Sequence, residues 1–333
     1  KPGFGHDRLV LDITEVGNDL TNLTARTSFD HQYRRMLRTI LRSEQILTGQ
    51  QRGDTREAPQ SSQKIVIDLR GTAGCPRPLP GSSLRWINKP PIPVELLWYL
   101  RGDDNVMYLR QHGVKFWDSE ADDDGFVGVS YGLMTNFDGK RGPKVLENNQ
   151  LERVIQNLCA GKIESRNNNV TLCNRAVPTR QAACTSGFQV KGNSQTNTLD
   201  MTVDQRSSDV CIGLPFDIVI WSMLLHLICR EVELRTEGEQ KLSAGTLTFE
   251  IVSAHVYLKN ESAAEELLKR AIIPAEASKQ PHLSIDEAKR DTSMFELEPA
   301  DLKINGWGPG TFHRTDGGKD VFGRTTGSLA GFL

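Results

Sequence analysis

Apolar and polar positions recur along the chain with two different periods, which predict helices in some segments and strands in others. From Asp30 to about Leu47 the apolar residues return every three or four positions. We therefore expect a helix with Asp30 as its N-cap and Gly49 just beyond its end. Similar patterns predict further helices over residues 94–101, 105–112, 148–158, 215–230 and 261–270.

Strands are predicted where apolar and polar residues alternate, over residues 64–69, 170–172, 185–191, 199–203 and 246–258. Turn-forming residues at 191–197 join two of these segments, which favours an antiparallel hairpin. Helices mixed with neighbouring antiparallel strands are typical of an α+β fold. Residues 1–28 have weak periodicity and are interpreted as an N-terminal extension, followed by one domain over residues 29–333. The tail from Gln280 carries no pattern that we can assign.

Composition and charge exclude several classes of protein. The net charge of the 333 residues is -2, whereas a general nucleic-acid binder would be markedly basic. The most apolar stretch, residues 210–227, is interrupted by Asp217 and His226, so it predicts a buried helix with a core histidine and not a membrane span. The six cysteines form no CxxC pair and have no histidine at metal-ligand spacing. We expect a cytoplasmic protein with reduced thiols and no metal site.

Five segments, taken together, resemble the thymidylate synthase family in their order and approximate spacing. The resemblance covers about residues 30–310. It implies a three-layer fold whose mixed, mostly antiparallel sheet forms the interface of a homodimer, with one catalytic domain over residues 29–333. The segments are Glu95–Asp103, Trp117–Asp118 with Gly125 and Tyr131–Gly132, Cys184–Gln189, Arg206–Ile218 and His255–Tyr257.

The chemistry of the resemblance requires a nucleophile and a proton relay. Carbon C5 of a pyrimidine becomes nucleophilic when a thiolate adds to C6, and Cys184 in the CxxxFQ segment is the candidate. An ungapped count would place Ala182 there, but Phe188 and Gln189 fit the family pattern only with Cys184. Glu95 in its apolar helix suits proton relay with a raised pKa, and the resemblance adds Tyr131 as a catalytic residue.

A nucleotide monophosphate needs cationic donors, and arginine binds phosphate oxygens in a bidentate manner. The resemblance assigns this task to Arg206 and Ser207, with Arg52 at a further arginine position and Arg56 as its possible substitute. It also implies that Arg166 reaches the phosphate from the partner subunit of the homodimer. Asn167 stands where family members have a second arginine, so a weaker grip is expected.

The remaining binding residues also follow from the resemblance. His255 and Tyr257 alternate on one strand and match the residues that hold the ribose 3'-hydroxyl. Gln205 is expected to contact the substrate. Trp117, Asp209 and Gly213 are expected to contact the cofactor, 5,10-methylenetetrahydrofolate.

Asp217 stands where family members that act on uracil carry Asn. An ionised Asp only accepts hydrogen bonds, so it faces uracil O4 acceptor to acceptor, whereas it accepts from the N4 amino group of cytosine. Once the thiolate adds at C6, N3 of cytosine gains a proton and Asp accepts from it too, so the interaction strengthens along the reaction. Asp217 thus indicates the cytidylate hydroxymethylase branch of the family, with CMP or dCMP as substrate.

The outcome at C5 depends on whether water or hydride reaches the transferred carbon. Glu120 replaces the second Trp of the family's WDEW segment, and the chain lacks the family's apolar closing tail. A more polar pocket favours water and hence a hydroxymethyl product. The alternatives are a methylating enzyme acting on dUMP or dCMP, and a catalytically silent homologue that binds nucleotide or a partner protein.

Overall fold

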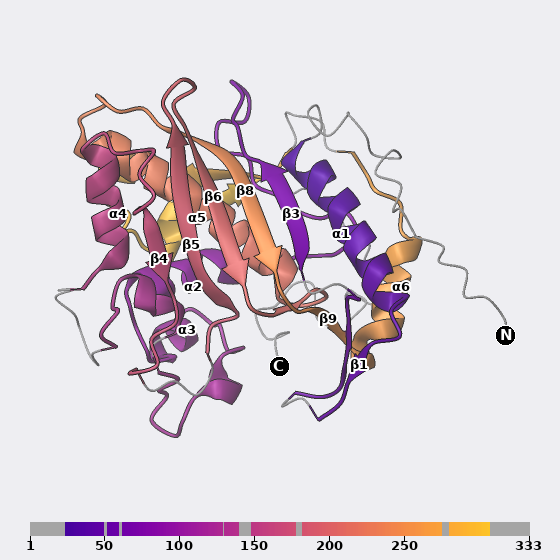
Figure 1. The fold of residues 1–333 in the computed structure, drawn as a ribbon. Helices are drawn as coiled ribbons and strands as arrows, with labels where there is room; N and C mark the ends of the chain where they lie inside the picture. The colour runs from indigo at the N-terminus through magenta and orange to yellow at the C-terminus, as the bar shows by residue number, and fades with distance from the viewer. Residues whose placement is uncertain are drawn as a thin grey trace, which may run out of the picture.

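A five-stranded mixed sheet forms the centre of the molecule in the computed structural model (Figure 1), in the order β3-β8-β6-β5-β4. Strands β6 and β8 are parallel, and the other neighbours are antiparallel. The prediction of a mixed, mostly antiparallel sheet is confirmed. The strands are β3 (Gln63–Asp68), β4 (Asn169–Thr171), β5 (Thr185–Asn193), β6 (Thr198–Gln205) and β8 (Ser243–Ile251). The structure describes residues 24–49, 52–59, 62–128, 130–139, 148–177, 182–274 and 280–306.

A second, smaller sheet has the order β1-β2-β9-β7 and brings distant parts of the chain together. Its strand β7 runs parallel to β9, which sets Asp209 beside His255. Strands β10 and β11 pair separately. The bounds are β1 (Ile46–Leu47), β2 (Thr55–Glu57), β7 (Ser208–Asp209), β9 (Ala254–Tyr257), β10 (His282–Ile285) and β11 (Leu302–Asn305).

Helix α5 packs against strands β6 and β8 and is buried along most of its length. In Figure 1 it lies with α2 behind the large sheet, while α1 lies beside β3 and α6 lies beside α1. No helix among the described residues is long and apolar enough to cross a membrane. The α-helices are α1 (Ala25–Leu41), α2 (Pro91–Leu100), α3 (Met107–Gln111), α4 (Gln150–Cys159), α5 (Leu214–Arg235) and α6 (Glu261–Lys269). Short 3-10 helices cover Asp118–Glu120, Tyr131–Met134, Leu258–Asn260, Glu287–Lys289 and Pro299–Asp301.

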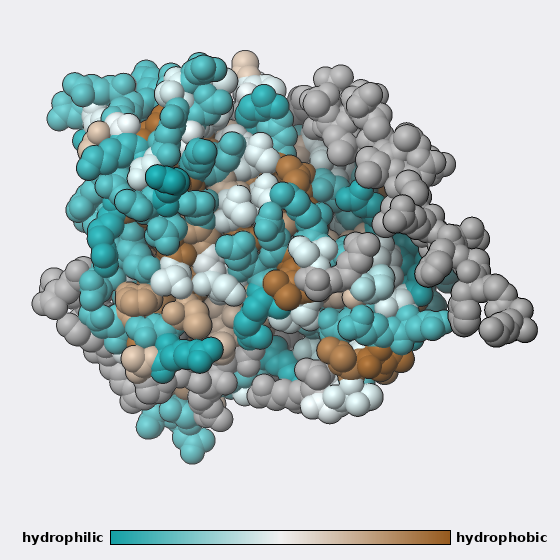
Figure 2. Space-filling model, in the orientation of Figure 1, coloured by the Kyte–Doolittle hydropathy of each residue, from teal (hydrophilic) through white to brown (hydrophobic). Residues whose placement is uncertain are grey.

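The two faces of the large sheet differ because side chains alternate along each strand. On β6, Leu199, Met201 and Val203 are buried against the helices, whereas Asp200 and Asp204 are exposed on the other face. Figure 2 shows hydrophilic side chains over much of this outer face. The helices therefore cover one face of the sheet only.

A glutamine side chain closes each edge of the large sheet. On β3, the amide of Gln32 from α1 donates to the carbonyl of Val66 at 2.7 Å and accepts from its N–H at 2.8 Å. On β4, Gln150 from α4 donates to the carbonyl of Thr171 at 2.8 Å and accepts from its N–H at 3.1 Å. Each side chain thus satisfies the backbone groups that a neighbouring strand would otherwise pair with.

The largest differences from the sequence-based expectation concern two elements. Helix α1 begins at Ala25 with Thr24 as N-cap and ends at Leu41, so the predicted bounds of Asp30 and about Leu47 are wrong. Asp30 is instead a buried residue that accepts hydrogen bonds from Ser82 and Ser83. The single strand predicted over residues 246–258 is two strands in different sheets. The domain division at residue 28 stays a prediction, and α1 crosses it.

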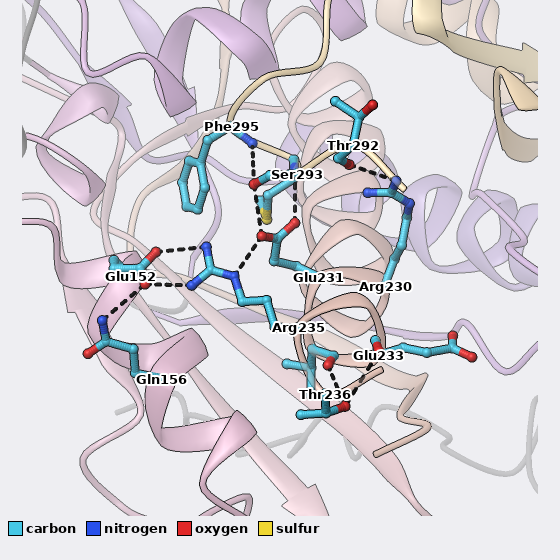
Figure 3. A network of polar contacts seen from close by, with 12 residues as sticks. Glu152, Gln156, Arg230, Glu231, Glu233, Arg235, Thr236, Thr292, Ser293 and Phe295 are labelled. Carbon is cyan, nitrogen blue, oxygen red and sulfur yellow. Dashed lines mark hydrogen bonds and ion pairs between the residues drawn. The ribbon is translucent and has the colours of Figure 1, made fainter. Parts of the chain in front are cut away.

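The C-terminal end of α5 is tied to the rest of the chain by a dense polar network (Figure 3). The buried carboxylate of Glu231 accepts from the hydroxyl of Ser293 at 2.8 Å, the N–H of Met294 at 2.7 Å and the guanidinium of Arg235 at 2.7 Å. Arg235 also forms two hydrogen bonds with Glu152 of α4. These contacts fasten residues 293–295 to two helices.

Candidate active site

Glu95 lies in α2, which starts with prolines at residues 91 and 93, and its side chain is only 7% exposed. Its Oε1 accepts from the hydroxyl of Tyr99 at 2.7 Å and from the indole N–H of Trp117 at 2.8 Å. Burial raises the pKa of Glu95 to about 7, and the charge of Asp217 adds to this while the two hydrogen bonds oppose it. A carboxyl group with this pKa can both release and take up a proton near neutral pH.

Tyr131 connects this carboxyl group to Cys184. Its ring stacks on Tyr99 with centroids 4.4 Å apart and meets Trp117 edge-on at 6.2 Å. Burial raises the pKa of Tyr131 strongly, and the charges of Cys184, Asp217 and Glu95 raise it further. A hydrogen bond from the backbone of Cys184 lowers the pKa in turn. The phenol therefore stays protonated beside the candidate nucleophile.

Cys184 is half-buried immediately before β5. Burial raises the pKa of its thiol and the Asp217 carboxylate raises it further, whereas the guanidinium groups of Arg206 and Arg52 lower it. The two arginines thus lie close enough to favour the thiolate, which is the reactive form. The carbonyl of Cys184 accepts from the backbone N–H of Arg206 at 2.9 Å, so the start of β5 and the end of β6 are joined here.

Asp217 lies in the first turn of α5, where the helix dipole favours a negative charge. Its Oδ2 accepts from Nε2 of Gln205 at 2.8 Å, and Oε1 of Gln205 is buried and has no partner within the described part of the chain. Burial raises the pKa of Asp217 to about 7, opposed by the hydrogen bond from Gln205. Gly213 precedes this turn, and a Cβ there would lie 3.9 Å from Oδ2 of Asp217. A side chain at residue 213 would therefore begin within van der Waals contact of the carboxyl group.

Asp209 and His255 sit side by side on the parallel strands β7 and β9. Oδ1 of Asp209 accepts from the N–H groups of Cys211 and Ile212 at 3.0 and 3.1 Å, which shapes the turn into α5. Nδ1 of His255 lies 3.5 Å from the hydroxyl of Ser207, and its ring meets Tyr257 edge-on at 5.3 Å. The small sheet therefore gathers the four polar residues into one group.

The candidate phosphate-binding arginines occupy different positions. The guanidinium of Arg206 donates to the carbonyls of Ala183 and Ala182 at 3.0 Å, and that of Arg52 pairs with Glu120. Arg56, the possible substitute for Arg52, pairs instead with Glu261 of α6 and donates to the Ser43 carbonyl at 2.6 Å. Of these three, Arg206 and Arg52 act on the Cys184 thiol.

Arg166 is not brought into this cluster. It is exposed in the connection between α4 and β4, and its carbonyl accepts from the side chain of Gln189 at 2.9 Å. Gln189 is an exposed residue of β5. Arg166 therefore lies next to the sheet and apart from Cys184 of its own chain.

Two residues that support the site were missed in the sequence. Arg85 is 1% exposed, donates to the carbonyl of Cys211 through Nε, and lies over the ring of Phe216 at 5.5 Å. It comes from the Gly- and Pro-rich segment 71–93, where no periodicity signals a buried cation. Tyr99 could have been found, because it follows Glu95 by four residues on the same helix face. His226 is a core histidine as predicted, with Nε2 2.8 Å from the carbonyl of Pro78.

The arrangement of Glu95, Tyr131, Cys184 and Asp217 provides a thiol, a protonated phenol and two carboxyl groups that titrate near neutral pH. A comparison with protein families matches residues 31–314 to the family described as thymidylate synthase. The chain belongs to the thymidylate synthase family. Enzymes of this family use folate to modify C5 of pyrimidine nucleotides. The residues around Cys184 suit that chemistry, because it requires a nucleophile and proton transfer at one site.

The residues present also fit a folate. Trp117 offers an aromatic surface beside Glu95, and a carboxylate such as Asp209 can accept from the N–H donors of a pterin. Gly213 lies beside Asp209 and Asp217, and a Cβ there would lie 3.6 Å from the carbonyl of Asp209 and 3.9 Å from Oδ2 of Asp217. Among the described residues, no group of three His, Cys, Asp or Glu side chains could hold a metal ion.

Proposed function

We propose that this member of the thymidylate synthase family is a cytidylate 5-hydroxymethylase that acts on CMP or dCMP. The observation that carries the proposal is the carboxyl group of Asp217, held by Gln205 at the start of α5. An amide at this position would complement the hydrogen-bonding groups of uracil, whereas a carboxyl group complements those of cytosine. The proposal uses the order and contacts of the residues around Cys184.

Asp217 supports cytosine in both of its protonation states. Because its pKa is about 7, part of the population is protonated at neutral pH. The protonated form donates to N3 of cytosine and accepts from the N4 amino group. The ionised form accepts from the N4 amino group of cytosine. With uracil it would face the O4 oxygen, which is also an acceptor, so that base is disfavoured. Oδ2 is held as an acceptor by the amide of Gln205.

The reaction begins when the thiolate of Cys184 forms a bond to C6 of the base. The electron pair of the C5–C6 double bond moves toward C5 and C4, and N3 takes the proton from Asp217. The resulting carboxylate accepts from the N3–H that it has created, so the contact strengthens as charge develops. Glu95 and Tyr131 lie close enough to Asp217 to feel its charge, and they move protons to and from the base.

Trp117, Asp209 and Gly213 would hold the folate beside the base. When bound, methylenetetrahydrofolate supplies the one-carbon unit that is transferred to C5. The choice of water over hydride at this carbon is supported by the ion pair of Glu120 with Arg52, which puts two charged groups where the family has an apolar Trp. A polar wall of this kind admits water to the transferred carbon.

We also propose that two copies form a dimer through the outer face of the large sheet. Arg166 lies beside β5 at the rim of this face, and its carbonyl is fixed by Gln189. Packing of a second copy on the face would carry Arg166 toward the phosphate site of the partner. His255 and Tyr257 complete the substrate contacts at the ribose, and Arg206 and Ser207 those at the phosphate.

The test is one incubation of the protein with methylenetetrahydrofolate and equal amounts of CMP, dCMP, UMP and dUMP, read by mass spectrometry. A hydroxymethyl group on a cytosine nucleotide is expected, and the same run reports the sugar. A methylated nucleotide together with dihydrofolate would identify the enzyme as a synthase. That result would contradict the proposal that water reaches the transferred carbon. Products on uracil alone would contradict the role of Asp217, and no product would favour a silent homologue.

A further inference from the structure

The contact between Arg52 and Glu120 joins two parts of the site that are 68 residues apart in the chain. The side chain of Arg52 is 49% exposed, whereas that of Glu120 is only 12% exposed. The same Oε1 of Glu120 that pairs with Arg52 also accepts from the hydroxyl of Ser119 at 3.3 Å. Glu120 is thus a largely covered carboxylate that is paired with a half-exposed arginine.

Arg52 nevertheless belongs to the reacting centre. Its charge lowers the pKa of the Cys184 thiol, and it also lowers the pKa of Tyr257, which Glu120 raises. Arg52, Glu120 and Tyr257 therefore act on one another across the site. The carboxylate of Glu120 occupies Nη2 of Arg52, one of the donors that a phosphate would use.

Glu120 is also connected to the proton relay through the backbone. Its N–H donates to the carbonyl of Trp117 at 3.0 Å within the short helix Asp118–Glu120. The indole of Trp117 donates in turn to Glu95. A shift of Glu120 would therefore also move Trp117, whose indole donates to Glu95.

We propose that Glu120 is a positioning residue that serves as an internal counter-ion for Arg52 until the 5'-phosphate of the nucleotide displaces it. Phosphate competes well because it is doubly charged and binds the guanidinium in a bidentate manner. Displacement costs free energy, because it leaves Glu120 covered, without its cation and close to a new anion. Glu120 thereby weakens the binding of nucleotides and makes it depend on the phosphate. The inference rests on the proposed function only in requiring a nucleotide monophosphate as substrate.

The test is calorimetric binding of CMP, dCMP, UMP, dUMP and the nucleoside cytidine to the wild type and to Glu120→Gln, without folate. The variant is expected to bind the preferred monophosphate about fivefold more tightly, the size typical of a partly exposed ion pair. Its affinity for cytidine should not change. In the Arg52→Ala background, Glu120→Gln should change affinity by less than about twofold, because no ion pair remains to compete.

The matched control is Glu261→Gln, which breaks the pair of Arg56 with Glu261 and should leave nucleotide binding unchanged. Unchanged or weaker monophosphate binding by Glu120→Gln would overturn the inference, as would an equal change for cytidine. If the wild type prefers uracil nucleotides and Glu120→Gln binds them more tightly, the role of Glu120 is supported while the proposed base preference is contradicted. A wild type that binds no monophosphate would overturn both.

Discussion

Each end of α5 carries an acidic side chain, Asp217 near the N-terminus and Glu231 near the C-terminus, but the two carboxyl groups differ in how many hydrogen bonds they accept. At the C-terminal end, Glu231 accepts from Arg235, Ser293 and the backbone of Met294. At the N-terminal end, Asp217 accepts from Gln205, and burial holds its pKa at about 7. Glu231 is fully engaged in fastening the C-terminal segment. Asp217 keeps hydrogen-bonding capacity that a ligand can use.

This difference separates stability from chemistry within one helix. A buried carboxylate with several donors is stabilised as an anion and gains nothing from a further partner. One with few donors is costly to ionise, and a substrate that supplies donors or accepts its proton relieves that cost. Loss of the first group should therefore affect folding, and loss of the second should affect activity.

The largest expected effect is that of Asp217→Asn on activity with cytosine. The amide cannot give a proton to N3, so kcat/KM for the cytosine nucleotide should fall about 10³-fold, while activity on uracil nucleotides rises. The measurement is product formation from each nucleotide alone. Glu233→Gln, on the same helix at its other end, is the control. Unaltered cytosine preference in Asp217→Asn would remove the account of base reading.

Glu231→Ala should destabilise the fold without altering base preference. It leaves Ser293 and the N–H of Met294 without this acceptor and Arg235 with Glu152 alone, which is expected to lower the free energy of unfolding by about 3 kcal/mol. Chemical denaturation measures this. The matched control is Glu233→Ala, which removes a half-buried glutamate two residues further along the same helix. A loss no greater than that of the control would mean that the network of Figure 3 contributes little.

Glu95→Gln should stabilise the protein at alkaline pH. The folded-state pKa of Glu95 is raised from 4.5 to about 7, so its ionisation opposes folding as pH rises through this window. At pH 8 the variant should be more stable than the wild type by about 3 kcal/mol, and the difference should vanish near pH 4. Denaturation at pH 4.5, 6 and 8 measures the slope. A pH-independent difference would contradict the raised pKa.

The smallest effect is expected for Glu152→Gln, which weakens the outer part of the C-terminal network. The pair with Arg235 is partly exposed, so about 0.5 kcal/mol of stability should be lost, and less at high salt. Thermal unfolding with and without added salt measures it. An effect as large as that of Glu231→Ala would show that the network acts as one unit.

The sequence predicted the elements whose patterns are long and regular, above all α5 and the hairpin of β5 and β6. It missed the break between β8 and β9, because apolar residues recur at every second position on both sides of the bend, although Val252 directly follows Ile251 and shifts their phase by one residue. Ile46 and Leu47 continued the helical period of α1 in the same way, although they form β1. The grouping of Glu95 with Trp117 and of Asp217 with Gln205 depends on tertiary contacts. These appear in the sequence only through the resemblance to the family.

The glutamines at the two edges of the large sheet have a consequence for how copies of the protein can associate. An exposed edge strand recruits further strands and can lead to aggregation without limit. At Val66 and Thr171 the backbone donor and acceptor are already taken by Gln32 and Gln150. Growth by strand addition is blocked at both places, so the dimer proposed above would form through the broad face of the sheet and not through these edges.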